Sequence, residues 1–522
     1  MRHASAFGLL ALVLVAALPL AAQEPAARDS AHKAPPAPPD TTLSVTHHTI
    51  SVDGRPLKYT ATTGYLVMRD EKGEAKANIF FVAYTRDTTL PPAKRALTFA
   101  FNGGPGSSSV WLHLGALGPR KVLMGDDGEA PSPPYQLVDN PDTWLTFTDL
   151  VFIDPVTTGY SREAAGEDPK QFHGLEEDAQ SVGDFIRLYA TRFDRWDSPK
   201  FLAGESYGTT RAAALSGYLQ DRYGMYLNGI VLISSVLNFQ TIDFNPGNDL
   251  PYTLFLPSYT ATAWYHHRLT PDLQADLGTT LDSARAFALG DYTRALFAGD
   301  ALSAAQDTAI ADRVARFTGL SPDYVLRANL RISEDRFTKE LMRGERRTVG
   351  RLDSRYVGID ADAAGEGPDY DPSYAAIYGV YTALINDYLR TDLGYKNDLP
   401  YEILTGRVGP WNFGSARNRY AYVGETLRGA MTQNPALRVF VAAGYFDLAT
   451  PFAAAEYTFA HLGLDPSLRG HVTLEHYASG HMVYVRKAVE HQLTQDVQAF
   501  AQAAGAGGAP TGGAGTAGGS RK

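Results

Sequence analysis

Short apolar runs bounded by turn residues constrain the fold of this 522-residue chain more than any other feature. Each run lacks the alternation of a strand with one wet face, so it suits a strand buried on both faces. Amphipathic helical patterns at 178–193 and 209–223 lie between runs, and Gly224 is expected to end the second helix. The runs are 96–103, 149–155, 200–206, 228–234 and 437–444. This alternation predicts a doubly wound, mostly parallel α/β sheet covered by helices.

The strand pattern fades between residues 241 and 430, where helical segments, loops and aromatic residues take its place. We therefore expect an α/β core in two parts, 43–240 and 431–502, interrupted by a mainly helical cap insertion at 241–430. A chain of this length seldom keeps a single core, which supports an insertion over the sheet edge. A separate domain with its own function is the alternative.

The two ends of the chain differ in composition from the part between them. Residues 1–22 have a basic start, an apolar run and a small-residue cleavage zone, the pattern of a signal peptide. The apolar run is shorter than the roughly 20 residues that span a bilayer, so no stable membrane span is expected after cleavage. An uncleaved anchor is the alternative. Residues 23–42 are expected to form a Pro/Ala-rich linker, and residues 503–522 a disordered Gly-rich tail.

Composition and charge exclude several classes of protein. Apolar residues make up 44% of the chain, which is ample for a large core. The net charge is −10 and no Lys/Arg-rich stripe occurs, so we expect no nucleic-acid partner. The absence of cysteine excludes disulfides and thiol catalysis, and in an exported chain it suggests a bacterial periplasm or the exterior. The histidine pairs 47–48 and 266–267 lack metal-ligand spacing, so neither a metal nor a cofactor is expected.

A nucleophile motif occurs at 204–208, where the sequence reads GESYG. It matches G-x-S-x-G, with a strand-like run before it and a helical pattern after it, as in α/β-hydrolases. Small flanking residues permit the strained turn that exposes the Ser206 hydroxyl at the sheet edge. A serine hydroxyl is a weak nucleophile, so a base and an orienting acid must accompany it.

The base and the acid are expected on loops that follow two late strands. The fold orders its triad as Ser, then Asp or Glu, then His. Asp447 follows the strand-like run at 437–444, and His481 follows the run at 471–479. His476 is the rival base, but it lies within a strand-like run, where a structural histidine is commoner. Asp465 is a weak rival acid, because its surroundings resemble a helix-entry turn.

A glycine-rich loop at 101–109, FNGGPGSSS, follows the strand-like run at 96–100. Glycines let the backbone approach a reacting carbonyl closely with its N–H groups pointing inward. The loop is therefore expected to form an oxyanion hole. A phosphate cradle is the alternative, but no Lys-Ser or Lys-Thr follows the glycines.

A series of motifs in a fixed order indicates a narrower family than the α/β-hydrolases as a whole. Six motifs follow one another along the chain: NGGPGSSS, LGALGPR, VFIDPVTTGYSR, FLAGESYG, GYFDLATP and GHMV. In this order they resemble the serine carboxypeptidase family of the α/β-hydrolase superfamily. The resemblance implies that Ser206, Asp447 and His481 form the catalytic triad. It also implies an oxyanion hole from the N–H groups of Gly104 and Tyr207. By the same carry-over, the substrate's terminal carboxylate is expected to bind Asn102, Gly103 and Glu205.

Several positions depart from the family pattern: Phe101 replaces a tryptophan, Ser107 a cysteine, Tyr484 a proline and Ala116 a glutamate that assists carboxylate recognition. ISSVLN also lacks an expected Gly-Asn. Without the second glutamate, Glu205 is expected to ionise more readily, unless burial or a glutamate from the cap replaces the lost repulsion.

The expected function is hydrolysis of C-terminal peptide bonds through an acyl-enzyme on Ser206. An esterase, amidase or acyltransferase with the same triad is the first alternative, and a catalytically silent binding protein is the second. The expected partner is a peptide substrate. The sequence leaves open the preferred side chain at the cleaved bond and the oligomeric state.

Overall fold

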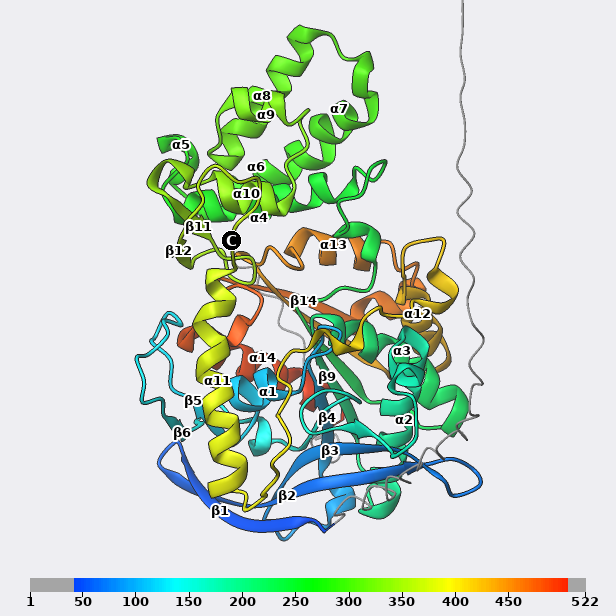
Figure 1. The fold of residues 1–522 in the computed structure, drawn as a ribbon. Coiled ribbons are helices and arrows are strands. Elements are labelled where there is room, and N and C mark those ends of the chain that lie inside the picture. Colours follow the sequence, from blue (N-terminus) through cyan, green and yellow to red (C-terminus); the bar gives the residue numbers. More distant parts are fainter. Residues whose placement is uncertain (1–41, 506–522) are drawn as a thin grey trace, which may run out of the picture. The chain divides into compact units, whose positions relative to one another are not determined.

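The computed structural model describes residues 42–505 and is built on one ten-stranded sheet (Figure 1). Its strands are β1 (Ser44–Val52), β2 (Arg55–Arg69), β3 (Ala75–Arg86), β4 (Ala96–Phe101), β7 (Thr148–Ile153), β8 (Arg162–Glu163), β9 (Lys200–Glu205), β10 (Gly229–Ile233), β13 (Arg438–Gly444) and β14 (Val472–Tyr477). The strand order is β1-β2-β3-β7-β4-β9-β10-β13-β14, and β8 pairs with β3. Pairings from β7 to β14 are parallel, whereas β1, β2, β3 and β7 pair antiparallel.

The five apolar runs of the sequence are β4, β7, β9, β10 and β13, so the predicted mostly parallel α/β sheet is confirmed. Burial on both faces explains why these runs do not alternate. In β9, Phe201 and Ala203 enter the apolar cluster on one face, while Leu202 enters the cluster on the other face. The antiparallel strands β1, β2 and β3 were not predicted, and β1 is the half-exposed edge of the sheet.

Helices cover both faces of the sheet. The cluster on one face includes residues of α2 (Leu175–Arg192), α3 (Tyr207–Tyr223) and α12 (Gly424–Gln433). The cluster on the other face includes residues of α1 (Val110–Leu112), α11 (Pro372–Thr391) and α14 (Lys487–Ala503). The two predicted helices correspond to α2 and α3, and Gly224 ends α3 in the left-handed conformation with φ 61°.

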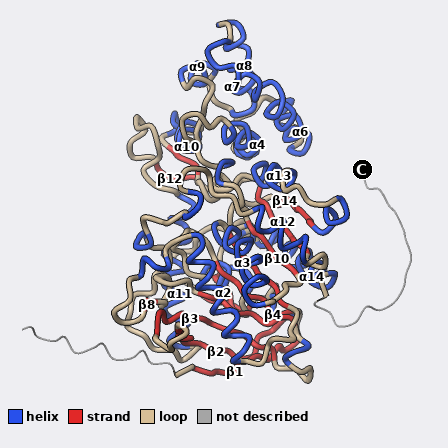
Figure 2. The backbone as a smooth tube through the Cα atoms, turned by 90° about the vertical axis from the view of Figure 1, so that its right-hand side faces the viewer, coloured by secondary structure: helices blue, strands red, loops and turns tan. Residues whose placement is uncertain are grey.

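The segment between β10 and β13 is mainly helical and partly has its own core. One apolar cluster joins α4 (Leu250–Tyr265), α6 (Leu277–Phe287), α8 (Ala304–Thr318) and α10 (Glu334–Glu340), together with β11 (Arg347–Val349). These helices form a group apart from the sheet layers, whereas α11 runs beside the sheet (Figure 1, Figure 2). The small strand β12 (Val357–Ile359) pairs with β11. The predicted boundaries of the cap and the two core parts stay predictions.

The predicted signal peptide at 1–22 lies outside the described residues, as do all but the last residue of the linker and most of the Gly-rich tail. Among residues 42–505, no helix combines the length and the apolar character needed to cross a membrane.

Candidate active site

Ser206 occupies a sharp turn between β9 and α3, with φ 60° and ψ −130°. A positive φ is rare for a residue with a side chain and is found where the surrounding structure enforces it. The flanking glycines are required by packing: a Cβ on Gly204 would lie 2.2 Å from the Gly208 carbonyl oxygen, and one on Gly208 would lie 2.7 Å from that of Phe101. The Ser206 N–H donates to the Ile233 carbonyl at 3.0 Å, which ties the turn to β10.

Asp447 and His481 lie together beyond the ends of β13 and β14. His481 Nδ1 is 2.8 Å from Asp447 Oδ2. The other carboxylate oxygen of Asp447 accepts from the N–H groups of Ala449 at 2.8 Å and Thr450 at 2.9 Å. Asp447 is fully buried and His481 is 5% exposed. These bonds fix the carboxylate and leave the opposite imidazole nitrogen, Nε2, free of the acid.

Burial by itself lowers the pKa of His481, but the Asp447 carboxylate and its hydrogen bond outweigh burial and raise the pKa above its ordinary value. The backbone of His481 is also fixed. Its N–H donates to the Leu352 carbonyl at 2.7 Å, and its carbonyl accepts from Ser234 Oγ at 2.6 Å. An imidazole oriented in this way by a carboxylate is the arrangement of a general base.

Ser206 and His481 border one cavity of about 200 Å³. No hydrogen bond within residues 42–505 joins the two side chains, and such bonds often tighten only when substrate binds. The cavity has two kinds of wall. The sheet-edge wall contains Asn102, Gly103, Gly104 and Glu205. The cap-side wall comes from the segment between β10 and β13 and contains Arg351, Tyr374, Ile377 and Leu404.

The glycine-rich loop lies against the start of α3. A Cβ on Gly103 would be 2.3 Å from the Tyr207 nitrogen, so only glycine fits there, and Gly104 has φ 100°. Among residues 42–505, neither the Gly104 N–H nor the Tyr207 N–H donates a hydrogen bond. Two unpaired N–H groups beside the Ser206 hydroxyl are suited to stabilise an oxyanion.

Asn102 and Glu205 form a buried polar pair in this cavity. Asn102 Nδ2 donates to Glu205 Oε1 at 2.9 Å, and Tyr484 Oη donates to Glu205 Oε2 at 2.5 Å. Burial raises the pKa of Glu205 to about 7, although His481, Tyr484 and Asn102 act in the opposite direction. Burial therefore replaces the repulsion expected to be lost with Ala116. Tyr484, known from the sequence only as a departure from the family, contacts Glu205 directly.

A buried ion pair behind the site could not be anticipated from the sequence. Arg211 Nε is 2.6 Å from Asp178 Oδ2, and another guanidinium nitrogen donates to the Asn102 carbonyl at 2.6 Å. The guanidinium lies 5.3 Å from the Phe101 ring centre and 5.5 Å from that of Tyr207. It therefore links α2, the glycine-rich loop and the start of α3. The only sequence signal is an arginine on the buried face of a predicted helix.

The rival residues make other contacts. The His476 ring stacks on Tyr445, and its Nε2 is 2.9 Å from Glu456 Oε1. Asp465 caps a short 3-10 helix by accepting from the Ser467 N–H at 2.9 Å. Neither residue borders the cavity of Ser206.

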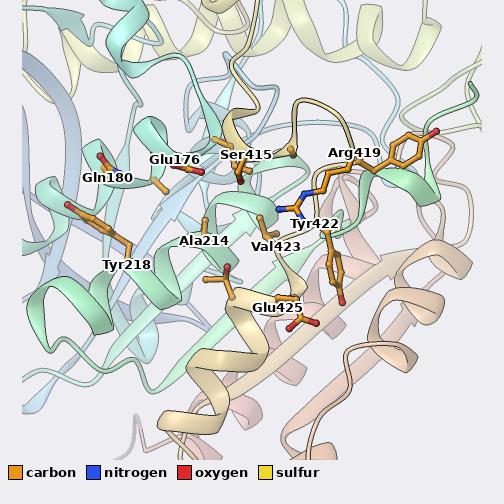
Figure 3. Close-up of a pocket in the computed structure, with 14 residues that line it drawn as sticks. Glu176, Gln180, Ala214, Tyr218, Ser415, Arg419, Tyr422, Val423 and Glu425 are labelled. Carbon is orange, nitrogen blue, oxygen red and sulfur yellow. The ribbon is translucent and has the colours of Figure 1, made fainter.

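A larger hollow of about 520 Å³ lies between α2, α3 and the residues leading into α12 (Figure 3). Glu176, Tyr218, Arg419 and Glu425 are among the side chains around it. None of the site residues expected from the sequence borders it. Size alone therefore does not identify the site in this protein.

Comparison with known proteins relates part of this sequence to a family. Residues 52–249 match the family model described as serine carboxypeptidase. A carboxypeptidase Y homolog from Arthroderma benhamiae is 32% identical over 161 residues, which is 30% of this chain and 29% of that protein. Serine carboxypeptidase-like 34 from Arabidopsis thaliana is 30% identical over 196 residues, which is 36% of this chain and 37% of that protein. The matches thus span about a third of these relatives.

A solved structure agrees over a larger part of the chain. The crystal structure of a prohormone-processing carboxypeptidase from Saccharomyces cerevisiae aligns with a TM-score of 0.54 and 16% identity, covering 85% of this chain and 91% of that one. At that identity the likeness shows the fold. The resemblance to the serine carboxypeptidase family is therefore confirmed, through the sequence of residues 52–249 and through an α/β-hydrolase fold.

Proposed function

We propose that this protein is a serine carboxypeptidase that releases C-terminal residues through an acyl-enzyme on Ser206. One observation supports the proposal above the others. Glu205, whose pKa burial raises to about 7, borders the same cavity as Ser206 and His481. A carboxyl group that keeps its proton in mildly acidic solution donates a hydrogen bond to another carboxylate.

In the proposed mechanism, His481 Nε2 accepts the Ser206 hydroxyl proton while Oγ attacks the carbonyl carbon of the last peptide bond. The N–H groups of Gly104 and Tyr207 stabilise the negative oxygen that forms. Asp447 holds the Nδ1–H of the imidazolium. His481 then gives its proton to the leaving nitrogen, the C–N bond breaks, and the rest of the peptide stays as an ester on Ser206. Water, activated by His481, hydrolyses that ester and restores the serine.

The restriction to C-terminal bonds follows from the sheet-edge wall. Asn102, Gly103 and Glu205 would bind the terminal carboxylate of the substrate. Asn102 has its Oδ1 occupied by the Leu112 N–H at 3.0 Å, so its side chain is held in one orientation. A protonated Glu205 attracts the terminal carboxylate, whereas an ionised Glu205 repels it. We therefore expect a preference for free C-termini in acidic solution.

Digestion of paired peptides, one with a free C-terminus and the other with a C-terminal amide, tests the proposal. At about pH 5.5, mass spectrometry should show stepwise loss of C-terminal residues from the free acid, slower loss from the amide and no loss with the Ser206→Ala variant. Internal cleavage of both peptides would contradict the proposal. Hydrolysis of simple esters without peptide cleavage would favour an esterase.

We also propose that the protein is exported, on the basis of the sequence of residues 1–22. N-terminal sequencing of the protein from its host should find a start near Gln23. A start at Met1 in a membrane fraction would contradict export with cleavage.

A further inference from the structure

The cap-side wall of the cavity carries one cation that the mechanism does not use. Arg351 follows β11, and its side chain is 49% exposed. Its backbone is fixed at both polar groups: the N–H donates to Asp371 Oδ1 at 3.0 Å, and the carbonyl accepts from the Leu448 N–H at 3.0 Å. Arg351 borders the cavity of Ser206, so its half-exposed side chain is accessible to a substrate bound there.

The Arg351 side chain is only weakly paired. Its Nε lies 3.5 Å from Glu334 Oε2, and no other ion pair of this side chain occurs among residues 42–505. By contrast, Arg331 in the same segment makes two bonds to Asp249, at 2.7 and 2.8 Å. Burial also raises the pKa of Glu334 to about 7, although Arg351 opposes this shift. In mildly acidic solution, Glu334 thus compensates the charge of Arg351 only in part.

The charges around the cavity favour an anion. The cavity is lined by one carboxylic acid, Glu205, which burial keeps protonated below about pH 7. It is also lined by one histidine, His481, which must be neutral to act as base. Arg351 is then the permanent charge in the cavity wall. Guanidinium groups bind carboxylates through two parallel hydrogen bonds, so a carboxylate is the group that this wall suits.

The position of Arg351 indicates which carboxylate it meets. The Leu352 carbonyl accepts from the His481 N–H at 2.7 Å, so Arg351 lies on the His481 side of the cavity. In the proposed mechanism the amino group of the leaving residue takes its proton from His481. The Cα of the leaving residue therefore lies on the His481 side of the cavity. Its terminal carboxylate goes to Asn102 and Glu205. Its side chain is left to face the wall that holds Arg351.

We infer that Arg351 makes the enzyme selective for substrates whose C-terminal residue carries an acidic side chain, glutamate or aspartate. This inference rests on the proposed carboxypeptidase function and specifies its substrate class. Arg351 is a specificity-determining residue in this account, and the chemical step does not depend on it.

The test uses three peptides that are identical except for a C-terminal Glu, Gln or Lys, and compares kcat/KM for release of that residue at about pH 5.5. Wild-type enzyme should prefer Glu over Gln by about tenfold or more, the range of a charge-assisted hydrogen bond. Arg351→Met should abolish this preference, and Arg351→Lys should retain part of it. Arg351→Glu should shift the preference toward Lys.

Arg336→Met is the matched control, because Arg336 lies in the same segment, pairs with Glu366 at 2.8 Å and does not border the cavity. It should keep the wild-type Glu-to-Gln ratio. Thermal unfolding of each variant identifies any loss of folding.

Two results would overturn the inference while leaving the proposed function intact. One is a wild-type enzyme that releases Gln as fast as Glu. The other is an Arg351→Met variant that slows all three peptides equally, since this would assign Arg351 to the terminal carboxylate. A wild-type enzyme that releases no C-terminal residue from any peptide would overturn the proposed function itself.

Discussion

The two walls of the catalytic cavity differ in how firmly the chain holds their side chains. On the sheet-edge wall, Glu205 is buried and accepts hydrogen bonds at both carboxylate oxygens, and Asp447, which holds His481 from behind, is fully buried. On the cap-side wall, Arg351 is half-exposed with one long ion pair, and Leu404 is also exposed. Groups proposed to perform the chemistry are thus fixed by buried polar contacts, whereas Arg351 and Leu404, proposed to contact the side chains of the substrate, are held loosely. Substitutions on the two walls should therefore have different kinetic signatures.

The largest effect is expected at the sheet-edge wall. Ser206→Ala and His481→Ala should each lower kcat by about 10³-fold or more, because nucleophile and base act as one unit. Asp447→Asn should lower kcat strongly as well, by favouring the wrong imidazole tautomer. Steady-state kinetics with a C-terminal acid peptide measures these effects, and circular dichroism checks the fold. Near-normal turnover by the His481 variant would remove the proposed base.

The ion pair behind the sheet-edge wall should contribute mainly to stability. Arg211→Met leaves the buried Asp178 without its partner, so the free energy of unfolding should fall by about 3 kcal/mol or more. Arg316→Met, which breaks the exposed pair with Asp272, is the matched control and should cost less than about 1 kcal/mol. Urea denaturation measures both. Equal losses in the free energy of unfolding would show that the buried Arg211–Asp178 pair stabilises the protein no more than the exposed pair.

Glu205 should make the preference for free C-termini depend on pH. Its protonated form predominates below a pKa of about 7, so the ratio of kcat/KM for acid over amide should fall as pH rises through 7. Well above 7 the fall should approach about tenfold per pH unit, the rate at which the protonated fraction declines. Paired substrates measured from pH 5 to 8.5 give this ratio.

Tyr484→Phe sharpens the same prediction. The Tyr484 hydroxyl donates to Glu205 and favours its ionised form, so its removal should move the pH midpoint of the ratio upward. A merely structural role for Tyr484 would change the rates and leave the midpoint in place. A strong preference for the free acid that is flat with pH would contradict the role proposed for Glu205.

The smallest effect is expected on the cap-side wall. Leu404→Ala removes apolar contact with the substrate, so KM should rise by about tenfold or less while kcat changes little. Initial rates over a range of peptide concentrations separate the two constants. A large fall in kcat with unchanged KM would mean that this wall takes part in the chemical step, and the comparison would fail.

The same contrast explains what could be predicted from the sequence. The parallel strands were predictable because burial on both faces leaves uninterrupted apolar runs, and β9 with Ser206 was predictable because its tight turn requires small residues. Tyr484 could not be assigned to Glu205, because 279 residues separate them and no local pattern records the contact. Arg351 was missed for the same reason, since its place depends on how a long helical segment folds back over the sheet.

Active-site labelling determines whether Ser206 is an activated nucleophile. The protein is treated with a fluorophosphonate, digested, and mapped by mass spectrometry, alongside the Ser206→Ala and His481→Ala variants. We expect one adduct on the peptide that contains Ser206, no adduct in the serine variant and greatly slowed labelling in the histidine variant. Stable folded protein that forms no adduct, or an adduct on a different residue, would contradict the claim that Ser206 is an activated nucleophile.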